Sequence, residues 1–155
     1  VRLAENGGII MINYGSAFVT EEANKYNTKR SDAWEKFLSL EDGAQIDMYN
    51  PELRNDRDAF NKQYAELNPY PFATLEQTLD HFDHVVMLTG SVDFVGIGSD
   101  YDGVGNTLPI GLKDVSSYPN LINGLMQRGY SNDDIKKILG ENLLRVWGEI
   151  ENGAE

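Results

Sequence analysis

The sequence of 155 residues contains no cysteine and only two histidines, His81 and His84. The lack of cysteine excludes disulfides, thiolate metal sites and cysteine nucleophiles. No apolar run approaches the roughly 20 residues of a membrane span, and no signal peptide is visible. Because the chain begins at Val1 and enters the apolar run 9–12 almost at once, we expect it to be part of a larger protein. The missing signal therefore does not indicate a compartment.

Basic residues are also scarce. The chain has 13 Lys and Arg against 25 Asp and Glu, a net charge of -12. This balance argues against nucleic acid or an anionic membrane as a partner, since both need clustered positive charge. The hydrophobic content of 41% is ordinary for a globular protein, and the length is sufficient for one domain with a core.

The most informative stretch covers residues 92–103, VDFVGIGSDYDG. Its apolar residues are typical of a buried strand over 92–97, and Gly96 and Gly98 allow a close approach by backbone or ligand. Asp100 would then follow the carboxyl end of this strand, where parallel α/β folds and (β/α)8 barrels place their chemistry. Asp100 is therefore the leading candidate for a catalytic residue.

The remaining pattern predicts a βαβ unit. The run 9–13 has the length and composition of a strand covered on both faces, with a loop over residues 14–18 after it. A capping box of Thr74 and Gln77 begins an amphipathic helix that ends at Gly90. We expect its buried face to contain five apolar residues: Leu75, Leu79, Phe82, Val86 and Leu88. The polar stretch between strand and helix, about 20–72, predicts a helical excursion on the outside.

The C-terminal third predicts further helices, one capped by Ser117 and another opened by Ser131 with Asp134. Two strands cannot close a sheet, and a full (β/α)8 barrel typically needs about 250 residues. The fold class we expect is therefore α/β. Residues 1–155 are expected to form the C-terminal segment of a single (β/α)8 TIM barrel domain of the metal-dependent hydrolase type, incomplete as given.

Several segments in the same order resemble one family. Residues 96–103 resemble the "GIGSDFDG" signature of the renal (membrane) dipeptidases, and residues 80–84 (DHFDH) resemble their "DHIDHI" helix. Residues 109–119 match the "P-x-GL-x-D-V-S-x-YP" segment, and 140–146 (GENLLRV) match the "G-x-N-x-LRV" ending. Residues 7–13 (GGIIMIN) resemble the strand that precedes the last βα unit of the family's barrel. The resemblance extends along nearly the whole chain.

This resemblance implies a zinc dipeptidase with two bridged zinc ions in a (β/α)8 barrel. It implies that Asp100 lies beside the metal-bridging water, shuttles the proton and holds the amino end of the substrate. It also implies that Asn13 and the loop from Tyr14 to residue 18 line the substrate pocket. The family's metal ligands lie upstream of the part matched here, so this segment has no expected ligands and should bind no zinc tightly alone.

Other interpretations compete at single residues. His81 and His84 share a helical face, but zinc helices more often use four-residue spacing, which favours packing and a hydrogen bond to backbone or to Asp80 or Asp83. Asp100 and Asp102 resemble part of a calcium loop, yet Val104 and Gly111 stand where that loop needs ligands. For Asp102 a role in capping or bracing the loop is favoured.

The resulting hypothesis is a metallo-dipeptidase whose substrate is a dipeptide, with the segment alone inactive. Its partners would be the remainder of its own barrel, from the same gene or a separate chain, and a second copy in a homodimer, because a half barrel exposes strand edges. Two alternatives remain: a catalytically silent fragment that serves as a scaffold or binding module, and a related metal-dependent amidohydrolase with another amide substrate.

Overall fold

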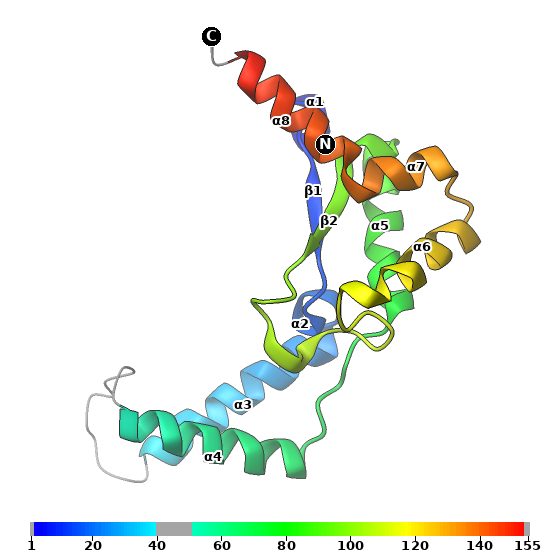
Figure 1. The fold of residues 1–155 in the computed structure, drawn as a ribbon. Helices are drawn as coiled ribbons and strands as arrows, with labels where there is room; N and C mark the ends of the chain where they lie inside the picture. The colour runs from blue at the N-terminus through cyan, green and yellow to red at the C-terminus, as the bar shows by residue number, and fades with distance from the viewer. Residues whose placement is uncertain (1, 40–50, 154–155) are drawn as a thin grey trace.

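In the computed structural model, a parallel pair of strands is packed against helices (Figure 1). The structure describes residues 2–39 and 51–153, with side chains described for 2–37 and 56–153. Strand β1 (Ile10–Asn13) pairs in parallel with β2 (Val95–Ser99). The described chain is α/β, as predicted, and mostly helical. Its two strands do not by themselves form a barrel.

In chain order, the helices lie before, between and after the two strands. α1 (Arg2–Glu5) precedes β1, and α2 (Ser16–Val19) follows it. Three more helices lie between the two strands: α3 (Glu21–Ser39), α4 (Pro51–Leu67) and α5 (Leu75–Thr89). The helices after β2 are α6 (Tyr118–Gln127), α7 (Asn132–Lys136) and α8 (Asn142–Gly153). Short 3₁₀ turns lie at Val92–Phe94, Gly105–Thr107 and Val115–Ser117, and a π turn at Lys137–Glu141 joins α7 to α8.

Helix α5 connects the strands and carries the core. Its capping box is confirmed: the Thr74 hydroxyl accepts from the Gln77 N–H, and the Gln77 side chain accepts from the Thr74 N–H. Gly90 ends the helix in the left-handed conformation, as predicted. The buried residues are Thr78, Leu79, Phe82 and Val85, and Leu75 and Val86 are partly buried against the core. The prediction was wrong for Leu88, which is exposed because it lies nine residues, about half a turn round, from Leu79.

The predicted second strand began too early. Residues Val92–Phe94 form a 3₁₀ turn, because the Ser91 hydroxyl accepts from the Asp93 N–H, and β2 runs from Val95 to Ser99. The buried Asn142 amide donates to the carbonyls of Val92 and Val95 and holds this junction. Within the described chain, β1 is not covered on both faces, since Ile10 and Met11 are exposed, whereas Val95 and Gly96 at the start of β2 are buried.

The core lies between the strands and one layer of helices. Ile12 and Val95 from the strands meet Leu79 and Phe82 of α5 and Leu121 and Leu125 of α6. Figure 1 shows α5, α6 and α7 on one side of the strand pair. The strand pair is therefore supported by one layer of helices.

The expected excursion is a helical hairpin that extends from the carboxyl end of β1 (Figure 1). Helices α3 and α4 form its two arms and lie within the predicted range of about 20–72. Aromatic rings hold them together: the ring centroids of Trp34 and Phe60 lie 5.2 Å apart, and those of Tyr26 and Tyr64 lie 5.5 Å apart. Part of the excursion, residues 40–50, lies outside the described residues.

Candidate functional site

The candidate site lies where β1 and β2 end, and an irregularity in their pairing shapes it. Ile12 pairs with Ile97, but the next pair joins Asn13 to Ser99, so Gly98 is an extra residue on β2. A Cβ on Gly98 would lie 3.0 Å from the carbonyl oxygen of Met11. The predicted close backbone approach at Gly98 is thus confirmed. Bulges of this kind re-aim the side chains that follow them and are common beside active sites.

The two residues after Gly98 have unusual backbone conformations. Ser99 has φ 42° and Asp100 has φ 65°, both in the left-handed region that residues other than glycine rarely adopt. Each such residue costs on the order of 1–3 kcal/mol, and such strain persists where the surroundings hold it in place, often at functional sites. The strained pair turns the chain so that Asp100 faces the end of β1.

The carboxylate of Asp100 is held on one side and given room on the other. The Asn13 amide Nδ2 donates to Asp100 Oδ2 at 2.7 Å. A Cβ on Gly103 would lie 2.6 Å from Asp100 Oδ1, so only glycine at position 103 leaves the carboxylate where it is. Two of the three predicted site residues, Asp100 and Asn13, therefore meet at one edge of the sheet.

Tyr14, the third predicted site residue, lies elsewhere. Its side chain has no exposed surface and packs edge-on against Tyr101, with ring centroids 5.9 Å apart. Burial raises the pKa of Tyr14, and it raises the pKa of Tyr101 to about 12. The predicted loop over 14–18 is largely helix α2, whose buried Ser16 hydroxyl accepts from the Ala73 N–H. This position indicates packing for Tyr14, and its contact with substrate stays a prediction.

In the portion of the chain that the structure describes, the two histidines do not form a metal-binding group with Asp100. His81 Nε2 lies 3.0 Å from the Val19 carbonyl oxygen, which confirms the predicted bond to backbone, and His84 is exposed. Asp102 is exposed, and the expected capping bond is not found among the described residues. Within the ranges 2–39 and 51–153, no three His, Cys, Asp or Glu residues are grouped so as to hold a metal ion. The described residues alone do not fit a zinc site.

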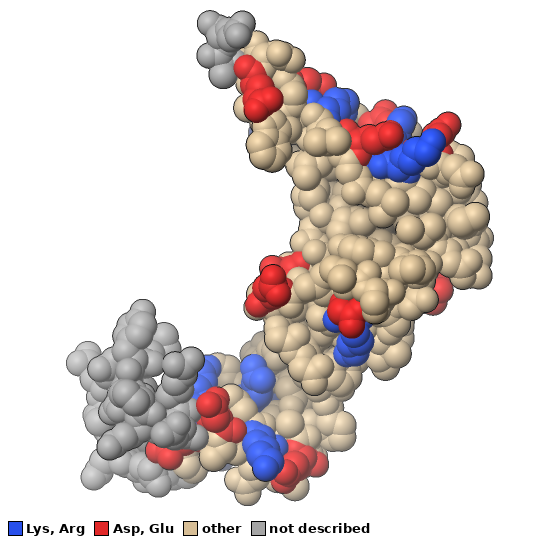
Figure 2. Space-filling model, viewed as in Figure 1, with Lys and Arg blue, Asp and Glu red and all other residues tan. Residues whose placement is uncertain are grey.

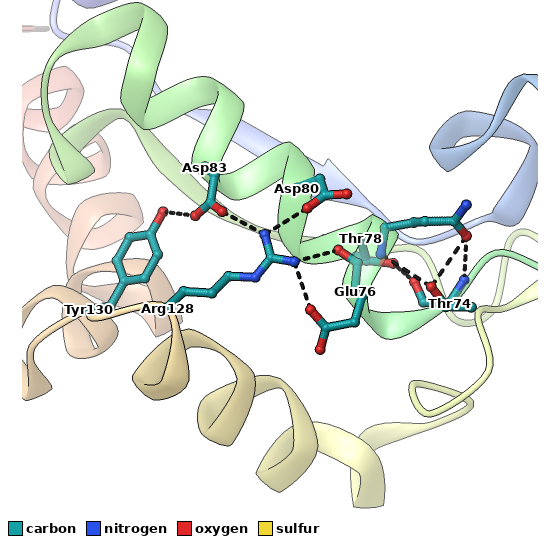
Figure 3. Close-up of polar contacts among 8 residues, drawn as sticks. Thr74, Glu76, Thr78, Asp80, Asp83, Arg128 and Tyr130 are labelled. Atoms are coloured by element: carbon teal, nitrogen blue, oxygen red, sulfur yellow. Dashed lines mark hydrogen bonds and ion pairs between the residues drawn. The ribbon is translucent and has the colours of Figure 1, made fainter.

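A second polar cluster, which sequence reasoning missed, joins α6 to α5 (Figure 3). The Arg128 guanidinium bonds to the carboxylates of Glu76, Asp80 and Asp83, and Tyr130 donates to Asp83 at 2.7 Å. Spacing of three and four residues places the three acids on one helical face, which is the signal that could have indicated a shared cation. Because Arg128 forms ion pairs with all three carboxylates, we interpret the cluster as a structural link between α5 and α6.

The comparisons with known proteins agree on one family. A family model described as membrane dipeptidase (peptidase family M19) matches residues 1–155. Dipeptidase 3 of Mus musculus is 45% identical over 84 residues, which cover 54% of this chain and 17% of that protein. Dipeptidase 3 of Homo sapiens is 45% identical over 83 residues, with the same coverage. An uncharacterized dipeptidase of Schizosaccharomyces pombe is 40% identical over 89 residues, 57% of this chain and 22% of that protein.

A solved structure matches the arrangement of the elements as well. The crystal structure of the probable dipeptidase PvdM from Pseudomonas aeruginosa superposes with a TM-score of 0.70 and 31% sequence identity, over 96% of this chain and 38% of that one. The matches thus span about a fifth of the length of the curated relatives. In the part of the chain that the structure describes, no helix is long and apolar enough to cross a membrane. The chain belongs to the membrane dipeptidase family, peptidase family M19.

Proposed function

We propose that the protein carrying this chain is a metal-dependent dipeptidase and that Asp100 is its proton-transferring carboxylate. The observation that carries the proposal is the position of Asp100, at the carboxyl end of a parallel strand, in a strained turn and held by Asn13. This is the edge at which α/β barrels place catalytic groups. The named relatives of the chain are dipeptidases, which supports a dipeptide as substrate.

The architecture that we propose is a (β/α)8 barrel of which this chain is the C-terminal segment. Support comes from the exposed Ile10 and Met11 on β1, which offer apolar surface to further strands, and from the coverage of only 38% of PvdM. The two zinc ions expected for the family would be held by residues outside the described part of this chain. A bridged zinc pair supplies an activated water and stabilises the developing oxyanion.

Asp100 would move the proton in this reaction. A carboxylate oriented by one hydrogen bond keeps a second oxygen available to accept a proton from the attacking water. The same group then delivers that proton to the amine nitrogen that leaves when the peptide bond breaks. Such a positioned acid/base typically contributes 10²- to 10⁴-fold, or about 3–5 kcal/mol of the activation barrier.

The experiment is an assay of the complete protein with L-L dipeptides, L-D dipeptides and N-acyl amino acids. We expect hydrolysis of dipeptides that a chelator abolishes and zinc restores. Preference for N-acyl substrates would instead indicate a related amidohydrolase. A folded, zinc-loaded protein that cleaves none of the three would indicate a silent scaffold and overturn the proposal.

A further inference from the structure

The side chain of Asn13 uses both ends of its amide inside the chain. Its Oδ1 accepts the backbone N–H of Gly15 at 2.8 Å, and its Nδ2 donates to Asp100 Oδ2 at 2.7 Å. A backbone N–H can only donate, so the Gly15 bond identifies which end of the amide is the oxygen. The nitrogen must therefore face Asp100. This assignment makes the second contact a charge-assisted bond to a carboxylate, the stronger kind.

This amide connects the segments that follow two different strands. Gly15 lies after β1, whereas Asp100 lies after β2, 87 residues away from Asn13 in the sequence. The bulge at Gly98 creates the contact, because it pairs Asn13 with Ser99 and so brings the next residue, Asp100, beside it. Asn13 thus sets the direction of the carboxylate from one side.

We infer that Asn13 is a positioning residue that aims the carboxylate of Asp100, and that it is not a substrate ligand. The inference rests on the proposed role of Asp100 in proton transfer. A group that acts by orienting another group affects the chemical step, since misplacement by about 1 Å can cost on the order of 100-fold in rate. A substrate ligand would mainly affect KM.

Two variants separate the contact with Asp100 from the contact with Gly15. Asn13→Asp keeps an oxygen that accepts from the Gly15 N–H, but it places a second carboxylate against Asp100, and like charges repel. Asn13→Ala removes both contacts. Asn132→Asp, at an exposed position in the first turn of α7, is the matched control for adding one negative charge.

The kinetic test uses the complete, zinc-loaded protein. We expect Asn13→Asp and Asn13→Ala each to lower kcat by roughly 10- to 100-fold with little change in KM, while Asn132→Asp changes neither. In an Asp100→Glu background, Asn13→Ala should lower kcat much less, because the effects of mutations at two contacting residues are not additive. A raised KM with kcat unchanged would overturn the inference, and so would full additivity.

A second test does not depend on activity. In protein labelled with ¹⁵N-asparagine, Asp100→Asn should shift the side-chain amide signals of Asn13, and Asp102→Asn should leave them in place. Unshifted signals in Asp100→Asn would overturn the inference whatever the enzyme does. If the shift is seen but no dipeptide is cleaved, the orientation of Asp100 by Asn13 stands and the proposed function fails.

Discussion

At the scale of single residues, the site depends on a few places where backbone and side chains approach closely. Gly98 lies against the backbone of β1, and the left-handed Ser99 and Asp100 follow it directly. Asn13 and Gly103 then bound the Asp100 carboxylate on two sides. The site is thus built from backbone geometry as much as from functional groups.

Gly103→Ala tests this geometry. The new Cβ would lie 2.6 Å from Asp100 Oδ1, and the carboxylate, as the flexible partner, would move. We expect a loss of kcat on the order of 100-fold and a change in the free energy of unfolding of less than about 1 kcal/mol. Steady-state kinetics and urea denaturation measure the two effects. Gly148→Ala, where a Cβ meets nothing within 4 Å, is the control. Unchanged kcat in Gly103→Ala would show that the carboxylate position is irrelevant.

Sequence reasoning proposed Asp100 and Asn13 as site residues but could not foresee their contact. The prediction placed the strand at 92–97, whereas β2 is Val95–Ser99 with a bulge at Gly98. A bulge depends on the pairing partner, which a single sequence does not contain. The family resemblance implied that Tyr14 lines the pocket. In the structure the chain turns at Gly15 into α2 and Tyr14 packs inward, so its contact with substrate stays a prediction.

At the scale of elements, the contact between α5 and α6 combines apolar packing with one central ion-pair cluster. Leu79 and Phe82 pack against Leu121 and Leu125, and Arg128 at the end of α6 binds three acids along α5 (Figure 3). The Arg128 side chain is only 19% exposed, so its bonds are less screened than those of a surface pair. Since α5 supports both strands, this tie indirectly supports the site.

Arg128→Ala should therefore destabilise the protein. The change leaves three neighbouring carboxylates without their cation, and we expect a loss of about 2 kcal/mol in the free energy of unfolding. Arg128→Lys should restore part of it, since one ammonium cannot reproduce the fork of the guanidinium. Lys25→Ala, which breaks the solvated pair with Glu21, should have a much smaller effect. Equal losses in Arg128→Ala and Lys25→Ala in urea denaturation would contradict this account.

Predictions for elements succeeded where the signals are local. The capping boxes at Thr74 and Ser131 and the end of α5 at Gly90 were correct, because each depends on residues within one turn. Ser117 is the N-cap residue of α6, as predicted, but its side chain makes no capping bond there; Asp114 accepts from the Ser116 N–H in the turn before it. The coverage of β1 on both faces is not seen within the described chain, since it depends on residues far away in the sequence.

At the scale of the whole molecule, the described chain is open on one side. Figure 2 shows a hollow lined mainly by uncharged surface. Large exposed apolar residues are numerous across the chain: Ile10, Met11, Phe18, Phe37, Leu67, Met87, Leu88, Ile110, Val115, Met126, Leu139, Leu143, Leu144, Trp147 and Ile150. So much exposed apolar surface is unusual for an isolated globular unit and is consistent with the proposed place in a larger barrel.

Alkaline pH should destabilise the fold through its buried tyrosines. Burial raises the pKa of Tyr14, Tyr101 and Tyr130 in the folded chain, that of Tyr101 to about 12. In the unfolded chain tyrosine ionises near pH 10. The unfolded state therefore loses protons first, so stability is retained below about pH 10 and falls as the pH rises above it.

Phenolate absorbance and urea denaturation across this range test the effect. Ionisation of part of the tyrosines should lag until the chain unfolds, and Tyr14→Phe should weaken the alkaline loss of stability. The Tyr14 hydroxyl has no partner among the described residues, so this variant costs little at neutral pH. Simultaneous ionisation of all eight tyrosines near pH 10 without a loss of stability would refute the prediction.

The most direct measurement compares Asp100→Asn with Asp102→Asn in the complete protein, recording kcat for a dipeptide together with zinc content. Both variants remove one negative charge from the same exposed loop, and only one removes the carboxylate that Asn13 holds. We predict that Asp100→Asn lowers kcat at least about 100-fold while zinc content is unchanged, and that Asp102→Asn has little effect. Wild-type kcat in Asp100→Asn would contradict the account.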